Sequence, residues 1–139
     1  MSIDFSTEFG TKALRQLETE QMLWMTTVSA SGTPQPNPVW FLYQHGDVVV
    51  YTKPDAIRIK NIARNSQVCL HFNSDEGGHE MTVLTGIAIV EPSIPRVIDN
   101  PAYIEKYADG IERIGLTPQS MSDTYSVPIR VDLRKLRGW

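Results

Sequence analysis

The chain has 139 residues, of which 41% are hydrophobic and 21% are charged. This length and composition are those of an ordinary globular domain, and they exclude a disordered or fibrous protein. Its formal net charge is −3, from 13 basic and 16 acidic residues, which disfavours nucleic acid as the main partner because such binding needs a basic surface. We expect one domain over residues 1–139, with any phosphate-binding site confined to a small region.

The first part of the chain predicts a helix followed by three antiparallel strands. Residues 6–20 carry apolar side chains among charged ones, with Ser6 or Thr7 as a possible cap, which is typical of an amphipathic helix. Aromatic and β-branched residues then predict strands at 22–28, 35–43 and 48–52. Short polar connections separate these strands, as in a meander.

The middle of the chain predicts a short basic helix between two strands and a longer strand. Asp55 is a plausible N-cap for a helix from Ala56 to about Arg64. The next strands are expected at 68–72 and 81–91, and Gly86 marks a bulge or a close approach in the longer one.

The last third predicts two helices and a closing strand. Asn100-Pro101 and Thr117-Pro118 each place a capping residue before a proline, which is typical of helix starts. Alternating apolar residues predict a final strand over 125–133. Six strands with peripheral helices indicate a mainly β fold, a closed or partly closed antiparallel barrel. Side chains fill the interior of so small a barrel, so a sizeable ligand would bind in a groove or between subunits.

The junction after the third strand carries residues that suit an anionic ligand. Thr52 can donate a hydrogen bond, amides at a helix start are unpaired, and Arg58 and Lys60 supply positive charge. Arg58 and Lys60 lie about 200° apart around a helix, so they can address one phosphate only from an unwinding first turn. The alternative interpretation is a solvent-exposed basic face.

The strand at 35–43 contains Pro36 and Pro38, which cannot donate ladder hydrogen bonds. The prolines indicate an edge strand whose backbone amides and carbonyls are free to bind a planar heterocycle. Alternatively, they only protect the edge against pairing with other molecules. Trp40 likewise has two interpretations, as a core residue or as a surface on which a ligand stacks.

The remaining residues offer little catalytic chemistry. His45, His71 and His79 show no metal-like spacing, so we expect no metal site. No nucleophile motif or pair of catalytic carboxylates is visible, and no catalytic residue is assigned. Trp139 follows a run of cations, and either packs on its own barrel or covers a ligand or a partner subunit.

Cysteine usage and hydropathy bear on the compartment. Cys69 is the only cysteine, so no intrachain disulfide can form, and its apolar surroundings favour a packing role. No window approaches the roughly 18 apolar residues of a membrane span, and the N-terminal residues lack an export signal. We expect a soluble, cytoplasmic protein that binds neither membrane nor nucleic acid.

The order of these motifs resembles the flavin- and deazaflavin-binding split-barrel proteins related to pyridoxamine 5'-phosphate oxidase. The segments that carry the resemblance are 25–28 with 31–34, 38–41, 51–52 with 58–65, and 68–70. Residues 85–88 and the closing Arg137-Gly138-Trp139 are similar to the actinobacterial branch that uses the deazaflavin coenzyme F420. The residues that bind the substrate phosphate in the pyridoxamine phosphate oxidases proper are not found.

The resemblance implies a six-stranded antiparallel split β-barrel, the FMN-binding split barrel, which forms a homodimer with cofactor grooves at its interface. It implies phosphate contacts from Thr52, Arg58 and Lys60, with Asn61 nearby, and a ring lying along residues 37–40. The cofactor-binding residues expected on this basis are Asn37, Pro38, Val39, Trp40, Tyr51, Thr52, Lys53, Arg58, Lys60, Asn61 and Trp139.

The activity that the resemblance implies is an oxidoreductase reaction. Reduced F420 would transfer hydride to a conjugated small-molecule acceptor, and the protein would orient the reactants and exclude water. Two alternatives stay open, an FMN-binding oxidoreductase of the same fold and a non-catalytic protein that binds or sequesters F420.

Overall fold

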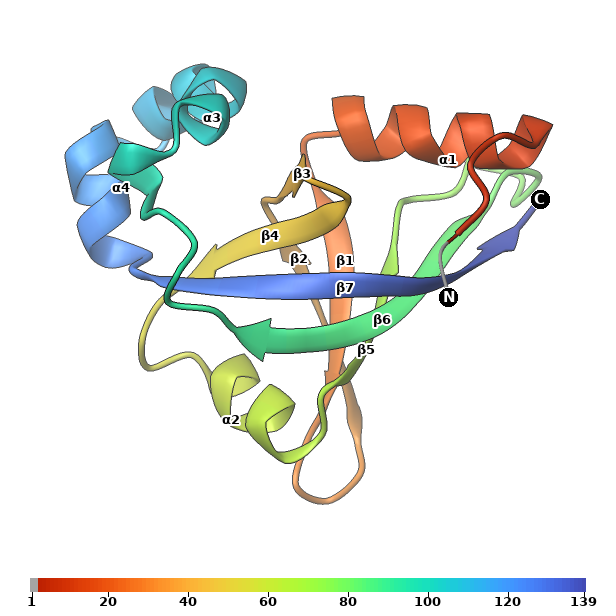
Figure 1. Ribbon diagram of the computed structural model, residues 1–139, viewed down its shortest axis with the longest axis horizontal. Helices are drawn as coiled ribbons and strands as arrows, with labels where there is room; N and C mark the ends of the chain where they lie inside the picture. The colour runs from red at the N-terminus through yellow and green to blue at the C-terminus, as the bar shows by residue number, and fades with distance from the viewer. Residues whose placement is uncertain (1–2) are drawn as a thin grey trace.

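The computed structural model describes residues 3–139, which form one curled antiparallel sheet with helices around it. Met1 and Ser2 belong to the N-terminal residues predicted to lack an export signal, and they lie outside the described residues. The strand order is β2-β1-β5-β6-β7-β4-β3. Figure 1 shows the half-barrel that results, with α1 across one end, α2 toward the opposite end, and α3 and α4 together at the side. The predicted mainly β split barrel is confirmed.

The strands are β1 (Leu23–Val28), β2 (Pro34–Val39), β3 (Leu42–Gln44), β4 (Asp47–Thr52), β5 (Gln67–His71), β6 (Thr82–Val90) and β7 (Val127–Gly138). The helices are α1 (Glu8–Thr19), α2 (Ile57–Arg64), α3 (Pro101–Arg113) and α4 (Pro118–Thr124), with a 3₁₀ helix η1 (Val97–Asp99) before α3. Within the described part of the chain, no helix has the length and hydrophobicity needed to cross a membrane.

The described sheet has seven strands instead of six because the strand predicted at 35–43 is broken. β2 ends at Val39 and β3 starts at Leu42. β2 pairs with β1 whereas β3 pairs with β4, so the break carries the chain from one edge of the sheet to the other. The Phe41 N–H donates to the Tyr107 hydroxyl of α3 instead of to a strand. A continuous apolar pattern does not reveal such a change of partner.

The start of α2 also differs from the prediction. Ala56 is the N-cap residue and no side chain caps the helix, so the assignment of Asp55 as the cap is wrong. The N–H groups of Ile57 and Arg58 have no hydrogen-bond partner within residues 3–139. By contrast, Thr7 caps α1 through its side chain, as one of the two predicted alternatives. Two backbone donors therefore remain available at the N-terminus of α2.

Two hydrophobic clusters lie on opposite faces of the sheet. The inner cluster fills the half-barrel, and the outer one lies between β4 and the helices α3 and α4. Val48 and Val50 of β4 belong to the inner cluster, whereas Val49 and Tyr51 belong to the outer one. β4 is therefore buried on both faces, which fixes the strand that leads to Thr52.

β7 is longer than predicted and connects the two ends of the molecule. Val127 pairs with Thr52 at one end, and Gly138 pairs with Thr82 at the other. A strand of this length spans roughly 35 Å. Gly86 of the adjacent strand lies at a register shift, and a Cβ there would lie 2.4 Å from the Asp132 carbonyl oxygen, which confirms the predicted bulge.

Candidate functional site

The most distinctive charged group of the chain is the half-buried guanidinium of Arg58. Its Nη1 donates a hydrogen bond of 2.8 Å to Thr52 Oγ1, and Thr52 is only 1% exposed. No carboxylate among residues 3–139 lies within ion-pair distance of Arg58. Burial lowers the pKa of Arg58, an effect that Tyr125 partly opposes. A desolvated cation without a counter-charge favours an anionic ligand at this point.

Arg58 separates two cavities. The larger, which we call the aromatic cavity, has a volume of about 380 Å³ and is lined by Pro38, Val39, Trp40, Tyr51, Arg58, Tyr103, Ile114, Met121 and Tyr125. The smaller, which we call the hairpin cavity, has a volume of about 240 Å³ and is lined by Met25, Thr27, Gln35, Asn37, Ile57 and Arg58. Among residues 3–139, Arg58 is the one charged residue in either lining.

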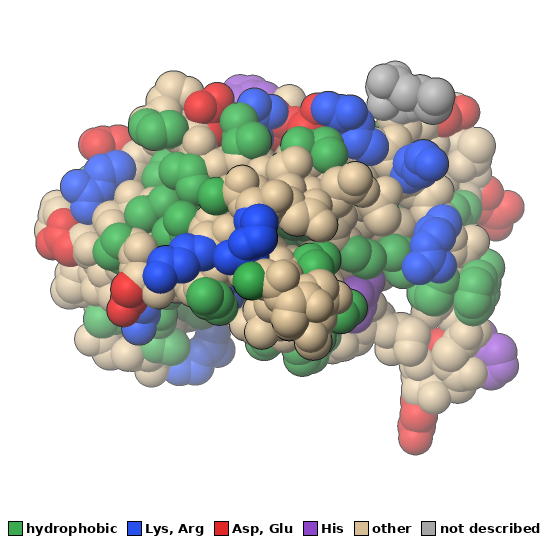
Figure 2. Space-filling view, turned by 90° about the horizontal axis from the view of Figure 1, so that it is seen from below, with side chains coloured by type: hydrophobic (Ala, Val, Ile, Leu, Met, Phe, Trp, Pro, Cys, Tyr) green, Lys and Arg blue, Asp and Glu red, His purple; other side chains and the backbone are tan. Residues whose placement is uncertain are grey.

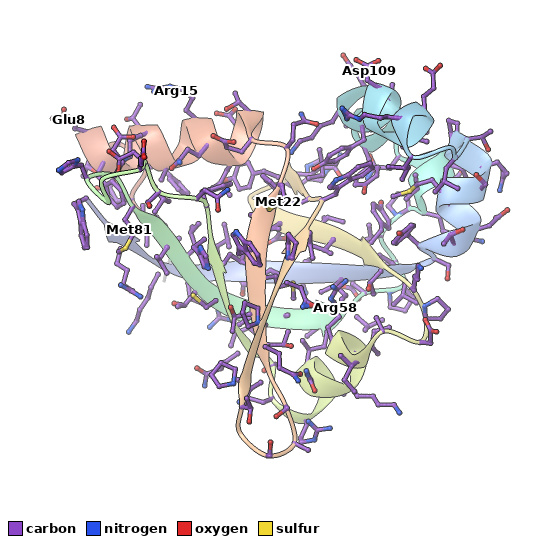
Figure 3. All side chains as sticks on the ribbon, turned by 180° about the vertical axis from the view of Figure 1, so that it is seen from behind. Glu8, Arg15, Met22, Arg58, Met81 and Asp109 are labelled. Atoms are coloured by element: carbon purple, nitrogen blue, oxygen red, sulfur yellow. The ribbon has the colours of Figure 1, made fainter. Side chains whose placement is uncertain are left out.

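The position of these cavities follows from the topology. The aromatic cavity lies where the half-barrel stays open, with the end of β2 on one side, β4 and α2 on another, and α3 and α4 above. Figure 3 shows Arg58 beside α2, at the opposite end of the sheet from α1. Figure 2, a view onto the side that carries α2, shows Lys and Arg side chains near the middle of this face.

The outward edge of β2 offers carbonyl groups but almost no amides. The Ser29 N–H donates to the Thr33 oxygen, so Ser29 and Thr33 form a hydrogen-bonded pair. Every second pair along the β1–β2 ladder is therefore also a hydrogen-bonded pair. Pro34, Pro36 and Pro38 occupy the intervening positions, whose backbone groups point away from β1. At these three positions the outward edge of β2 therefore offers carbonyl groups and no amides, because proline has no N–H.

Helix α3 holds Trp40 against the aromatic cavity. The Trp40 and Tyr107 rings stack with centroids 4.5 Å apart and planes inclined by 2°. A Cβ at Gly110 would lie 3.0 Å from Trp40 Cη2, so the glycine lets the indole approach the helix. The Phe41 oxygen accepts hydrogen bonds from Lys106 Nζ and the Tyr107 hydroxyl. Trp40 is thus both packed on α3 and part of the cavity wall.

Two predicted residues at the end of β4 point to opposite faces. The Tyr51 hydroxyl donates to the Pro95 oxygen and accepts from Asn100 Nδ2, so its ring, not its hydroxyl, is available to the cavity. Burial raises the pKa of Tyr51. The Thr52 hydroxyl accepts a hydrogen bond from Arg58 and lines neither cavity, so any effect of Thr52 on a ligand would pass through Arg58.

Three further predicted residues have different surroundings. Lys53 is exposed, with its Nζ 5.6 Å from the centroid of the Tyr125 ring. Lys60 is exposed and lines neither cavity. Asn61 is 1% exposed, and its Nδ2 donates to Thr27 Oγ1 and Gln35 Oε1 at 3.0 and 2.9 Å, so it fastens α2 to the β1–β2 hairpin.

Trp139 lies far from Arg58 within the chain, because β7 separates them. It is 63% exposed, and its Nε1 donates to the Gly78 oxygen. Together with α1 and the loop before β6 it borders a third cavity of about 560 Å³, lined by Glu8, Phe9, Lys12, Arg15, His79, Glu80 and Trp139. The predicted Trp139 contact with a ligand at Arg58 could come only from a second copy of the chain.

Sequence analysis missed most of the residues that line the aromatic cavity from α3 and α4. Tyr103 lies in α3, Met121 lies in α4, and Tyr125, predicted as the start of the final strand, is the C-cap residue of α4. The spacing of Tyr103 and Tyr107 predicts that both rings lie on one face of the helix, but it does not predict what packs against that face. Gly110 in the middle of a helix was the one local signal of a close neighbour.

The open half-barrel, with an aromatic cavity and Arg58 at its split, is a split-barrel fold. Residues 10–139 match the family described as pyridoxamine 5'-phosphate oxidase. The chain therefore belongs to this family, and the resemblance seen in the sequence is confirmed. No curated protein matches the chain by sequence.

Solved structures support the fold. A candidate pyridoxamine 5'-phosphate oxidase from Listeria innocua is 20% identical, with a TM-score of 0.65 over 92% of this chain and 95% of the other. An F420 reductase is also 20% identical, with a TM-score of 0.63 over 88% and 94% of the two chains. The heme storage protein HutZ from Vibrio cholerae is 18% identical, with a TM-score of 0.64 over 94% of each. At these identities the likeness concerns the fold alone.

Proposed function

We propose that this protein is an F420-dependent reductase that transfers hydride to a conjugated small-molecule acceptor. The observation that carries the proposal is the half-buried Arg58, which has no carboxylate partner among the described residues and stands between two cavities. An anionic group of a cofactor would supply the missing charge. The similarity of fold to an F420 reductase supports the choice of cofactor.

The chemistry of the donor groups fits a phosphate. The guanidinium of Arg58 presents several N–H groups in one plane, and the free amides of Ile57 and Arg58 lie at the N-terminus of α2. Thr52 would orient the guanidinium through the hydrogen bond already present. Lys60 would add long-range attraction from the exposed side of α2, and Lys53 would do so from the preceding loop.

The aromatic cavity fits a planar ring. Its volume of about 380 Å³ is near the lower end for ligand sites, so it would hold the ring while the rest of the cofactor extends past Arg58. Trp40, Tyr103 and Tyr125 provide flat surfaces, and Asn37 to Trp40 provide the backbone edge. No acidic or histidine side chain lines the cavity within residues 3–139, so these residues bind, orient and exclude water.

The bound cofactor would supply the hydride, and the protein would set its distance from the acceptor. An apolar wall of Ile114 and Met121 favours a hydrophobic, conjugated acceptor next to the ring. The alternatives are an FMN oxidoreductase and a protein that only binds F420. A heme-binding role at this site is disfavoured because no histidine of the described chain lines either cavity beside Arg58.

We also propose a homodimer. The outward face of β1, β5 and β6 carries Trp24, His71 and Ile87, and α3 and α4 cover only the other half of the sheet. A second copy would bury this half and could bring its Trp139 to the cofactor. Light scattering at micromolar concentration should give twice the mass of the chain, and a monomer would argue against a shared site.

The central experiment is a titration of the purified protein with F420 and FMN, each oxidised and reduced. Tryptophan fluorescence should fall on F420 binding, since Trp40 lines the cavity. Steady consumption of reduced F420 with quinones or enones would support a reductase, whereas binding without turnover would favour sequestration. Tighter binding of FMN than of F420 would support the flavin alternative, and binding of neither would remove the proposal.

A further inference from the structure

The Tyr103 hydroxyl is a donor without a partner in the wall of the aromatic cavity. The Tyr103 ring contacts the rings of Tyr51 and Tyr107, with centroids 4.9 and 4.8 Å away. The Tyr51 hydroxyl donates to the Pro95 oxygen, and the Tyr107 hydroxyl bonds to the backbone of Phe41. Only 1% of Tyr103 is exposed, yet its hydroxyl has no hydrogen-bond partner within residues 3–139. This tyrosine therefore differs from both of its neighbours.

The free hydroxyl opens into the aromatic cavity. In residues 3–139, every side-chain oxygen of a buried or half-buried residue that is shut off from solvent has a hydrogen-bond partner. Because the Tyr103 hydroxyl has no partner, it is not shut off, and the cavity is the open space that Tyr103 lines. A desolvated hydroxyl without a partner is costly, and a ligand atom that accepts its hydrogen bond removes that cost.

The charge state of Tyr103 decides which ligand atom suits it. Burial raises the pKa of Tyr103 well above its ordinary value, and Tyr107, Tyr51 and Tyr125 raise it further. The phenol therefore keeps its proton and stays neutral. A neutral O–H suits a carbonyl oxygen, whereas Arg58 in the same lining suits an anion. The cavity thus has separate binding groups for two different atoms.

We propose that Tyr103 is a catalytic residue whose hydroxyl donates a hydrogen bond to the carbonyl oxygen of the hydride acceptor. This inference rests on the proposed function, since it assigns a residue to the acceptor of that reaction. The substrates that it selects are α,β-unsaturated carbonyl compounds, of which enones and quinones are examples. Ile114 and Met121, in the same lining, contact the hydrocarbon part of such a molecule.

The hydrogen bond stabilises the charge that develops on the acceptor. The carbon β to the carbonyl receives hydride from reduced F420, a C–H bond forms, and the C=C electron pair shifts so that the oxygen becomes an enolate. The Tyr103 O–H binds this enolate more strongly than it binds the starting carbonyl, which lowers the barrier. A proton from water then adds to the α carbon, and one proton returns to water from the oxidised cofactor. Tyr103 keeps its own proton throughout.

Thermal unfolding of two matched variants tests whether the hydroxyl lacks a structural partner. Tyr103→Phe removes a hydroxyl that bonds to nothing in residues 3–139, so its melting temperature should equal or exceed that of the wild type. Tyr107→Phe removes a hydroxyl that bonds to Phe41 and Gln21, so its melting temperature should fall. An equal fall in both variants would give Tyr103 a structural role and overturn the inference.

The carbonyl stretch of a bound acceptor reports the contact without turnover. Protein saturated with oxidised F420, or with FMN if that binds more tightly, is mixed with cinnamaldehyde, and Raman difference spectra give the C=O frequency. The frequency should be lower in the wild type than in Tyr103→Phe, because a hydrogen bond weakens the C=O bond. Tyr43→Phe removes a hydroxyl that lines neither cavity beside Arg58 and should keep the wild-type frequency. Equal frequencies in wild type and Tyr103→Phe, or no bound cinnamaldehyde, overturn the inference.

Steady-state kinetics separate this inference from the proposed function. With enones as acceptors, Tyr103→Phe should lower kcat at least about tenfold, as expected for a group that stabilises charge in the transition state. The F420 dissociation constant should not change, and Tyr43→Phe should keep the wild-type kcat. Unchanged kcat in Tyr103→Phe, or an equal loss of F420 affinity, overturns the inference and leaves the reductase standing. F420 binding without turnover of any enone or quinone overturns both.

Discussion

The two ends of the sheet each carry a cavity with basic side chains, but only one resembles a ligand site. The cavity beside Trp139 is the larger, about 560 Å³ against about 380 Å³ for the aromatic cavity. Its lining has both signs of charge, and most of these charged side chains are exposed. Arg58 at the other end is half-buried without a carboxylate partner in the described chain.

The contrast favours the cavity at Arg58, and not the larger cavity, as the place where an anion would bind. Exposed ions of both signs are solvated and screened, so they gain little from a further ligand. A partly desolvated cation has already lost part of its interaction with water, and an anion at short range replaces that interaction. Substitutions at the two ends therefore test which of the two cavities binds an anion.

The largest effect is expected at Arg58. Arg58→Met should weaken cofactor binding by about 10- to 100-fold, since a charge-assisted hydrogen bond contributes roughly 1.5–3 kcal/mol. Arg15→Met, the matched change at the Trp139 end, should leave affinity unchanged. Isothermal titration with F420 measures both. Lys60→Ala should weaken cofactor binding less than Arg58→Met does, because Lys60 is exposed. The reverse order would indicate that the phosphate lies on the other face of α2.

A smaller effect is expected at Gly110. In Gly110→Ala the new methyl group would lie 3.0 Å from Trp40 Cη2 and would push the indole toward the aromatic cavity. We expect a loss of cofactor affinity of about five- to tenfold. Alanine favours the helix by up to about 1 kcal/mol, so thermal unfolding should change little. Weaker binding together with a large loss of stability would instead indicate general damage to α3.

The next effect concerns the support of Arg58. Thr52→Val keeps the shape of a side chain that is 1% exposed but removes the acceptor for Arg58 Nη1. We expect a loss of about 1 kcal/mol in the free energy of unfolding and a few-fold loss of affinity. In the background of Arg58→Met, the change in affinity should vanish. An additive loss in the double variant would mean that Thr52 contacts the ligand itself.

The last effect depends on pH and concerns stability instead of affinity, at Lys106, whose Nζ donates a hydrogen bond to the Phe41 oxygen. Burial lowers the pKa of Lys106 to about 8, with Glu20 acting in the opposite direction. Between pH 8 and about 10 the unfolded chain binds more protons at this site than the folded chain, so the Lys106 contribution to stability rises with pH. In urea unfolding, the free energy of unfolding of the wild type should rise relative to that of Lys106→Met from pH 7 to 9.5. A constant difference would mean that the Lys106 pKa is ordinary.

Much of the fold was predictable because it depends on local patterns. Caps at Thr7 and Thr117, the turn at 44–47 and the bulge at Gly86 all have short sequence signals. The break at Trp40 was not predictable, since what ends β2 there is a hydroxyl on α3 that lies 66 residues away. Long-range partners of this kind leave no trace in local periodicity.

The site was predictable where charge and chain order coincide. Thr52 and Arg58 do meet, as expected for a strand that leads into a helix. The buried amide of Asn61 binds the β1–β2 hairpin, a contact that local sequence does not indicate. The tyrosines of the cavity wall were missed because a helix face shows its apolar character but not what lies opposite.

The pairing of β4 with β7 has a consequence for synthesis of the chain. Thr52 and its neighbours have their ladder partners at residues 127–131, some 75 residues later in translation. When Arg58 has been synthesised, the nascent chain still lacks β7, the strand that pairs with β4 beside the candidate site. Contacts so distant in sequence form late in folding. A cofactor that binds at Arg58 would therefore enter the finished barrel after the chain leaves the ribosome.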